Sequence, residues 1–139
     1  MTQAILQIVA DLKHLAQIRQ FVQQQAKVLG ADADAVFNMI MAVNEMVTNV
    51  IIHGYGGQPG PIEIEVSQAG DHSLAVYLRD QAPPFDPTVV PDPELNLPLD
   101  KRPLGKVGIY LTRRMVDEMT HRLNLQGGNE LTLLKKGVL

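Results

Sequence analysis

One stretch of the sequence decides the fold: 43-VNEMVTNVIIHGY-55. It is the second half of a segment, from about Ala35 to His53, in which apolar residues recur at helical spacing, and Gly54 follows where glycine commonly ends a helix. Asp32 or Asp34 can cap the start of this segment. The apolar stripe consists of Val36, Ile40, Val43, Val47 and Val50. We therefore predict a helix over residues 35–53 whose stripe packs on a sheet or on another helix.

The opposite face of this helix carries both apolar and chemically useful side chains. Glu45, Asn49 and His53 follow one another at four-residue spacing and so line up along one flank. They form either an exposed polar stripe or one wall of a cleft. In a cleft, Glu45 could accept a proton from an attacking hydroxyl, and Asn49 could join the ligands of a Mg²⁺ ion that also takes phosphate oxygens. His53 is the weakest of the three, because its place before Gly54 suits a C-terminal cap.

The pattern along the rest of the chain predicts one domain over residues 1–139. The expected elements are an edge strand at 4–10, a helix at 12–29, the helix at 35–53, a hairpin of strands at 62–66 and 74–78, a long loop at 81–105, a helix at 107–118, and strands at 119–126 and 131–136. Alternating strands keep one sheet face away from the core. The expected fold class is therefore α+β, a two-layer α/β sandwich whose mixed, mostly antiparallel sheet is covered by helices on one face.

Composition narrows the possible functions. The chain has 139 residues and no cysteine, which excludes disulfide scaffolds, zinc knuckles and thiol nucleophiles. Aromatic residues make up only 4% and the net charge is −3, so nucleic acid is an unexpected partner. We see no targeting segment and no apolar run long enough to span a membrane, and we expect a cytoplasmic protein without a membrane partner.

Charge is unevenly distributed along the chain. Residues 1–100 contain twelve acidic and four basic residues, whereas residues 101–139 contain three acidic and eight basic residues. The stretch 102-RPLGKVG-108 places glycines and Lys106 at the start of the helix expected at 107–118. The basic residues could simply form a solvated surface, and the glycines could simply form a turn. The two features occur together, however, and together they also suit an anion site at a helix N-terminus.

A third feature, 79-RDQAPPFDP-87, follows the strand expected at 74–78. This pattern indicates either a proline-stiffened turn or a site in which Asp80 accepts a hydrogen bond from an exocyclic amine such as that of adenine. Other phosphate-binding motifs are absent from the sequence: it contains neither a GxxxxGK[ST] loop nor the VAIK, HRD and DFG set of eukaryotic-type kinases.

Taken in order, these motifs resemble the GHKL, or Bergerat-fold, ATP-binding domains, and among them the bacterial anti-sigma factors that are also serine protein kinases. Residues 43–55 resemble the N box, residues 80–87 the first glycine box, residues 105–111 the second, and 128-GNELTL-133 the last strand motif. Two positions depart from the family pattern: Ala82 stands where a glycine is usual, and Lys106 follows Gly105 where a second glycine is common.

The resemblance implies that Glu45 is the general base and that Asn49 is the Mg²⁺ ligand. It implies that Asp80 accepts a hydrogen bond from the adenine amine and that residues 86–104 form a lid over ATP. The residues it places at the nucleotide are Asn49, His53, Asp80, Ala82, Pro84, Phe85, Gly105, Lys106, Val107, Gly108 and Thr132.

The implied function is that of a regulatory kinase that sequesters a sigma factor and uses Mg-ATP to phosphorylate an anti-sigma factor antagonist on serine. The alternative is a non-catalytic module of the same fold that acts by sequestering a partner. The ATPase end of a histidine kinase is a less favoured interpretation, because we expect no helix pair with a phosphoacceptor histidine before the domain. The resemblance also implies a homodimer. Exposed apolar residues of the helix at 12–29 or of the strand at 4–10 could form its interface.

Overall fold

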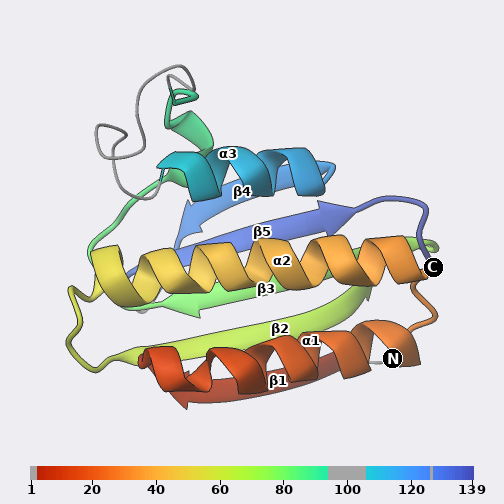
Figure 1. Cartoon of the computed structure of the whole chain (residues 1–139), viewed down its shortest axis with the longest axis horizontal. Coiled ribbons are helices and arrows are strands. Elements are labelled where there is room, and N and C mark those ends of the chain that lie inside the picture. Colours follow the sequence, from red (N-terminus) through yellow and green to blue (C-terminus); the bar gives the residue numbers. More distant parts are fainter. Residues whose placement is uncertain (1–2, 94–105, 126) are drawn as a thin grey trace.

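A computed structural model describes residues 3–93, 106–125 and 127–139 (Figure 1). The elements follow in the order β1 (Gln3–Val9), η1 (Leu12–His14), α1 (Leu15–Val28), α2 (Ala33–Asn49), η2 (Val50–Gly54), β2 (Pro61–Ala69), β3 (Ser73–Asp80), η3 (Pro87–Val89), α3 (Lys106–Met115), β4 (Glu118–Leu123) and β5 (Asn129–Lys135). Two glycine-containing turns close the hairpins β2–β3 and β4–β5, and Gly70, Gly127 and Gly128 in them have positive φ.

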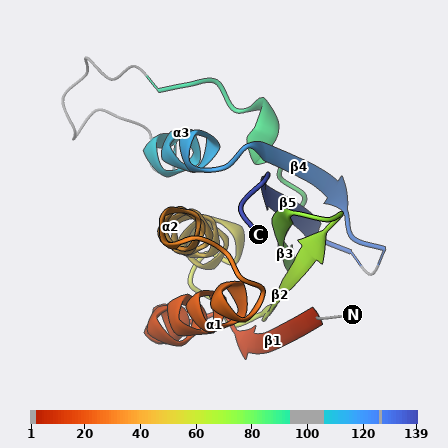
Figure 2. The ribbon, with the colours of Figure 1, turned by 90° about the vertical axis from the view of Figure 1, so that its right-hand side faces the viewer.

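The five strands form one sheet in the order β1-β2-β3-β5-β4. Figure 2 shows the three described α-helices on one side of this sheet; no described helix lies over the other side, which is called the uncovered face below. The expected α+β sandwich and the edge position of β1 are therefore confirmed. Each of the four pairings is antiparallel, so the described sheet has no parallel part and is simpler than the mixed sheet we expected.

Helix α2 lies at the centre of the helical layer and packs against both α1 and α3. Asp32 caps its first turn by accepting a hydrogen bond of 2.8 Å from the backbone of Ala35. Met39, Val43 and Val47 are almost fully buried on its sheet side. Ala42 is also fully buried, and the contact with α3 explains why the face opposite the valine stripe is so apolar.

By length and composition alone, the segment Ala33–Gly54 could cross a membrane, which corrects our expectation that no apolar run is long enough to do so. Its buried side chains account for this composition without a bilayer, because α2 packs against α1, α3 and β5. The apolar segment is the core helix of the domain.

Two helix ends differ from the sequence prediction. Helix α2 ends at Asn49 and the chain continues as a wider π-type turn, η2, in which the N–H of Tyr55 bonds to the carbonyl of Val50. The helix expected to reach residue 118 ends at Met115, because Glu118 already pairs with Leu134 of β5. Pairing with a distant strand outweighs the helical pattern at this end.

On the uncovered face of the sheet, Arg79 of β3 bridges three carboxylates. Its guanidinium lies 2.8 Å from Glu65, 2.6 Å from Glu130 and 3.6 Å from Glu63. Glu130 also pairs with Arg122 of β4. Glu65 and Glu130 are each only 7% exposed. Their ion pairs with arginine compensate for the loss of solvent around these two charged side chains.

Candidate functional site

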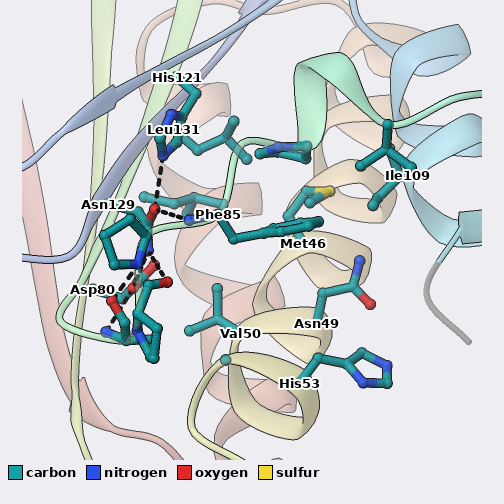
Figure 3. Close-up of a pocket in the computed structure, with 17 residues that line it drawn as sticks. Met46, Asn49, Val50, His53, Asp80, Phe85, Ile109, His121, Asn129 and Leu131 are labelled. Atoms are coloured by element: carbon teal, nitrogen blue, oxygen red, sulfur yellow. Dashed lines mark hydrogen bonds between the residues drawn. The ribbon is translucent and has the colours of Figure 1, made fainter.

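A cavity of about 450 Å³ lies between the end of α2, the end of β3 and the strands β4 and β5 (Figure 3). Its size is within the range of small-molecule sites in proteins. Most of its wall is apolar, and the polar side chains are few. The lining residues are Met46, Asn49, Val50, His53, Gly54, Leu78, Asp80, Ala82, Pro83, Pro84, Phe85, Pro87, Val90, Ile109, His121, Asn129 and Leu131.

Asp80 is the acid of this cavity, and it ends strand β3. Its Oδ1 accepts two hydrogen bonds, from the backbone of Ala82 at 2.9 Å and from Nδ2 of Asn129 at 3.0 Å. Burial raises the pKa of Asp80, and the bonds from Asn129 and Ala82, together with the nearby imidazole of His121, offset this only in part. With Oδ1 occupied on both sides, Oδ2 is the oxygen left to accept a hydrogen bond from a ligand.

Asn129 and His121 were not predicted from the sequence. Asn129 begins β5, and its Oδ1 lies 2.7 Å from Nε2 of His121 on β4. We placed Asn129 only in the last strand motif, 128–133, and His121 only in the strand expected at 119–126. The missed signal is the alternation in β4, which turns His121 to the same side of the sheet as the buried Leu131.

Asn49 and His53 both line the cavity from α2 and η2. Figure 3 shows them on the side of the cavity away from Asp80, with Met46 deeper along the same helix. The predicted alignment of Asn49 and His53 along one flank therefore places both at the cavity. His53 does not cap α2 as we expected, because the chain continues beyond Asn49 into η2 and the cap residue of η2 is Tyr55.

Glu45 lies one turn before Asn49 and is not among the lining residues. Its carboxylate packs against α3: a Cβ placed on Gly108 would lie 2.6 Å from Oε2 of Glu45. The absence of a side chain at position 108 is therefore what leaves room for this carboxylate between α2 and α3.

The turn after Asp80 forms another wall of the cavity. Ala82 is buried, and a Cβ placed on Gly54 would lie 3.0 Å from its methyl group. Pro84 and Phe85 also line the cavity, and Figure 3 shows the ring of Phe85 reaching across it toward Met46. The methyl group of Ala82 therefore packs against the end of η2.

Only part of the expected phosphate loop is described. Gly105 lies outside the described residues; Lys106 begins α3, and Val107 and Gly108 are in its first turn. Arg113, further along α3, binds Asp92 at 3.2 Å and the carbonyl of Pro87. Of the expected lid, residues 86–93 are described and are held to α3 by this arginine, and the remainder lies outside the described residues.

Thr132 is not part of the cavity, which corrects its expected place beside adenine. In β5 it pairs with Tyr77 and Thr120, whereas its neighbours Leu131 and Leu133 point to the helices and are buried. Side chains alternate along a strand, so Thr132 faces the uncovered side of the sheet.

No group of three or more histidine, aspartate or glutamate side chains in the described ranges could hold a metal ion by itself. The oxygen donor that faces the cavity from α2 is the amide of Asn49. This donor set suits Mg²⁺ only as part of a complex with a phosphate ligand, because Mg²⁺ keeps several waters and takes phosphate oxygens with few protein ligands. Chemically, the site offers an apolar slot with an acceptor at one end and an amide at the other.

Residues 8–135 match a family profile described as the histidine kinase-like ATPase domain. The chain is similar to the serine-protein kinase RsbW of Bacillus cereus (strain B4264), with 26% identity over 118 residues, which are 82% of this chain and 73% of that protein. It is 25% identical, over the same length and shares, to the protein of that name from Bacillus anthracis.

A solved structure has the same fold. The crystal structure of the RsbU and RsbW domains of Rv1364c from Mycobacterium tuberculosis matches 98% of this chain with a TM-score of 0.68 and 18% sequence identity. This chain spans 32% of that longer one.

Proposed function

We propose, from the premise that this chain belongs to the histidine kinase-like ATPase family, that it binds ATP in the cavity and transfers the γ-phosphate to a serine of a partner protein. One observation carries the binding half of this proposal: Asp80 stands at one end of an apolar cavity with one oxygen held by two donors and the other free for a ligand. Adenine has apolar faces and one amine-bearing edge, which such a slot accommodates.

Asn49 is the residue that would hold the metal of Mg-ATP, and the bound ion would neutralise charge on the phosphate oxygens. The phosphates would then extend from the adenine slot toward Asn49 and the first turn of α3. Val107 and Gly108 lie in that turn, where unpaired backbone N–H groups favour an anion.

Glu45 is proposed as the general base. It would take the proton of the serine hydroxyl while the serine oxygen forms a bond to the γ-phosphorus and the bond between that phosphorus and the β–γ bridging oxygen breaks. Glu45 lies on α2 one turn from Asn49, so the base and the metal ligand share one rigid element. Phosphoryl transfer needs mainly positioning and charge stabilisation from the protein, which suits so small a set of residues.

We also infer the setting of this activity. Relatives that carry the name serine-protein kinase support a protein substrate, and the resemblance to anti-sigma factors supports a cytoplasmic regulator that sequesters a sigma factor and phosphorylates its antagonist. A homodimer joined through α1 or β1 is part of this proposal, and Ile5 and Val9 of β1 are large exposed apolar residues available for it.

The test begins with ligand binding. Mg-ATP should raise the melting temperature, because a ligand that binds only the folded state adds about 2.7 kcal/mol at one hundred times its Kd. Glu45→Ala should then abolish transfer to the cognate antagonist while ATP binding, measured by calorimetry, persists. The absence of a thermal shift at millimolar ATP would reject the proposal.

A non-catalytic module of the same fold remains the second candidate, favoured by one observation: Glu45 packs against α3 and is not among the residues lining the cavity. That function predicts tight partner binding with nucleotide bound and no phosphorylated partner. Mass spectrometry of the antagonist after incubation with Mg-ATP distinguishes the two.

A further inference from the structure

The side chain of Asn129 is the centre of a buried hydrogen-bond network at the inner end of the cavity. Its Nδ2 donates to Oδ1 of Asp80 at 3.0 Å and to the carbonyl of Pro83 at 3.2 Å. Its Oδ1 accepts from the backbone N–H of Phe85 at 2.8 Å and lies 2.7 Å from Nε2 of His121. Asn129 is only 7% exposed, so one carboxamide joins β5, β4, the end of β3 and the turn that follows it.

The partners fix which way this carboxamide points. The N–H of Phe85 can only donate, and the carbonyl of Pro83 can only accept. The oxygen of Asn129 must therefore face Phe85 and its nitrogen must face Pro83 and Asp80. It follows that Nε2 of His121 carries a proton and donates to Asn129. An aspartate could not replace this residue, because it would place a second acceptor against Asp80.

The turn at 82–85 needs an external partner because of its own sequence. Pro83 and Pro84 have no backbone N–H, so neither can donate a hydrogen bond that would close the turn. Asn129 accepts the first N–H after the two prolines, that of Phe85, and donates to the carbonyl of Pro83. The turn is thus tied to β5 from outside.

Gly128 lets β5 approach closely enough for this. Its φ is +86°, and a Cβ at this position would overlap the carbonyl oxygen of Asp80 and the backbone of Gln81. The chain therefore brings Asn129 beside Asp80 through a glycine that no other residue could replace without strain.

We propose that Asn129, held by His121, is a positioning residue that sets the choice of purine by aiming the free oxygen of Asp80 into the cavity. The inference rests on the proposed binding of ATP and identifies what makes that binding selective. Adenine presents an amine to Oδ2 of Asp80, whereas guanine presents a carbonyl at the corresponding position, which would leave two acceptors facing each other. A carboxylate free to rotate would lose much of this discrimination.

The test compares the dissociation constants of Mg-ATP and Mg-GTP, measured by calorimetry on the whole chain. Asn129→Ala is expected to weaken ATP binding roughly tenfold, as loss of about one well-placed hydrogen bond to a charged group does, and to leave GTP binding almost unchanged. Asn129→Asp is expected to weaken ATP binding further, because it sets a second carboxylate beside Asp80.

The variants of His121 provide a milder form of the same test. His121→Ala removes one of the two donors to Oδ1 of Asn129 and should lower the ATP preference by less than Asn129→Ala does. His121→Gln keeps an N–H donor and should restore the preference. Thr132→Ala is the matched control, since it alters the same strand on the opposite sheet face and should leave the ratio of the two constants unchanged.

The outcomes separate this inference from the function on which it rests. Failure of the unaltered chain to bind ATP would overturn the proposed function. ATP binding by the unaltered chain with an equal loss of ATP and GTP affinity in Asn129→Ala would show a purely structural role and overturn only the present inference. An unchanged preference in both Asn129→Ala and His121→Ala would overturn it as well.

Discussion

Glu45 and Gly108 meet where α2 packs on α3, and a Cβ at position 108 would lie 2.6 Å from Oε2 of Glu45. The contact is with the far end of a flexible side chain, so an added methyl group could displace the carboxylate without displacing a helix. The space at Gly108 therefore controls where the proposed base can point.

Gly108→Ala separates stability from activity. Alanine in a helix is favoured over glycine by about 0.5–1 kcal/mol, so the free energy of unfolding should stay the same or rise slightly. Phosphoryl transfer should fall by about tenfold or more, because a base moved by about 1 Å can cost up to a hundredfold in rate. Urea denaturation and a transfer assay on one preparation would measure both.

A double variant supplies the control. On a Glu45→Ala background the carboxylate is gone, so Gly108→Ala should gain the full helical preference of alanine. An equal effect of Gly108→Ala on stability in both backgrounds would show that the two residues are not coupled.

Local pattern was enough to predict most of the helices and strands. The cap at Asp32 and the apolar stripe of α2 correctly located the central helix, and alternation in β2 correctly located a half-buried strand. The ends of elements depended on distant partners. Nothing near Val116 shows that Glu118 belongs to a strand, because its partner Leu134 lies in β5.

The residues of the candidate site, too, could be predicted only where a local motif marks them. Asp80 and Asn49 were predicted from motifs, and the structure places both at the cavity. The strand motif at 128–133 includes Asn129 but does not show its role, which depends on β5 pairing with β3 so that Asn129 lies opposite Asp80. Thr132 was expected at the nucleotide and lies outside the cavity for the same reason: the register of β5, which the sequence did not reveal, decides which of its side chains face the helices.

Tyr55 links the loop after η2 to the turn after β3 by hydrogen bonds. Its hydroxyl donates to the carbonyl of Pro61 at 2.6 Å and accepts from the N–H of Gln81 at 2.7 Å. Burial raises the pKa of Tyr55, the bond from Gln81 partly offsets this, and the charge of Asp80 adds to it. The hydroxyl therefore stays protonated and keeps both bonds at physiological pH.

Tyr55→Phe should lower the free energy of unfolding by about 1–2 kcal/mol, the worth of two hydrogen bonds. It should also weaken ATP binding a few-fold, because Gln81 is next to Asp80. Chemical denaturation and calorimetry would measure the two effects. Tyr77→Phe is the control: its ring contacts Arg79 on the uncovered sheet face, and its loss of a hydroxyl should leave ATP affinity unaltered.

Glu130 makes stability depend on pH. Burial works against its ionisation, but the hydrogen bonds from Arg122 and Arg79 outweigh burial and lower the pKa of Glu130 below its ordinary 4.5. A carboxylate with a lowered pKa in the folded state stabilises the protein above its ordinary pKa, and this stabilisation is lost as the pH falls through the lowered value.

Glu130→Gln should therefore reduce the free energy of unfolding by about 1–3 kcal/mol at neutral pH, with a smaller difference from the unaltered chain below pH 4.5. Urea denaturation over a series of pH values would measure it. Glu118→Gln, at a half-exposed pair with Lys136, should change stability by less than about 1 kcal/mol. A constant difference for Glu130→Gln at all pH values would contradict the assignment.

Asp80→Asn should change which purine is bound instead of merely weakening binding. The donors Ala82 N–H and Asn129 Nδ2 both point at the position of Oδ1, so the new amide must place its oxygen there and its NH₂ group toward the cavity. That group faces the adenine amine as a second donor, but it can donate to the carbonyl of guanine. ATP affinity should fall by at least roughly tenfold, and GTP should bind as tightly as ATP or more tightly. Calorimetric titration with both nucleotides would measure the ratio, and an Asp80→Asn protein that still preferred ATP would show that Asp80 does not read the base.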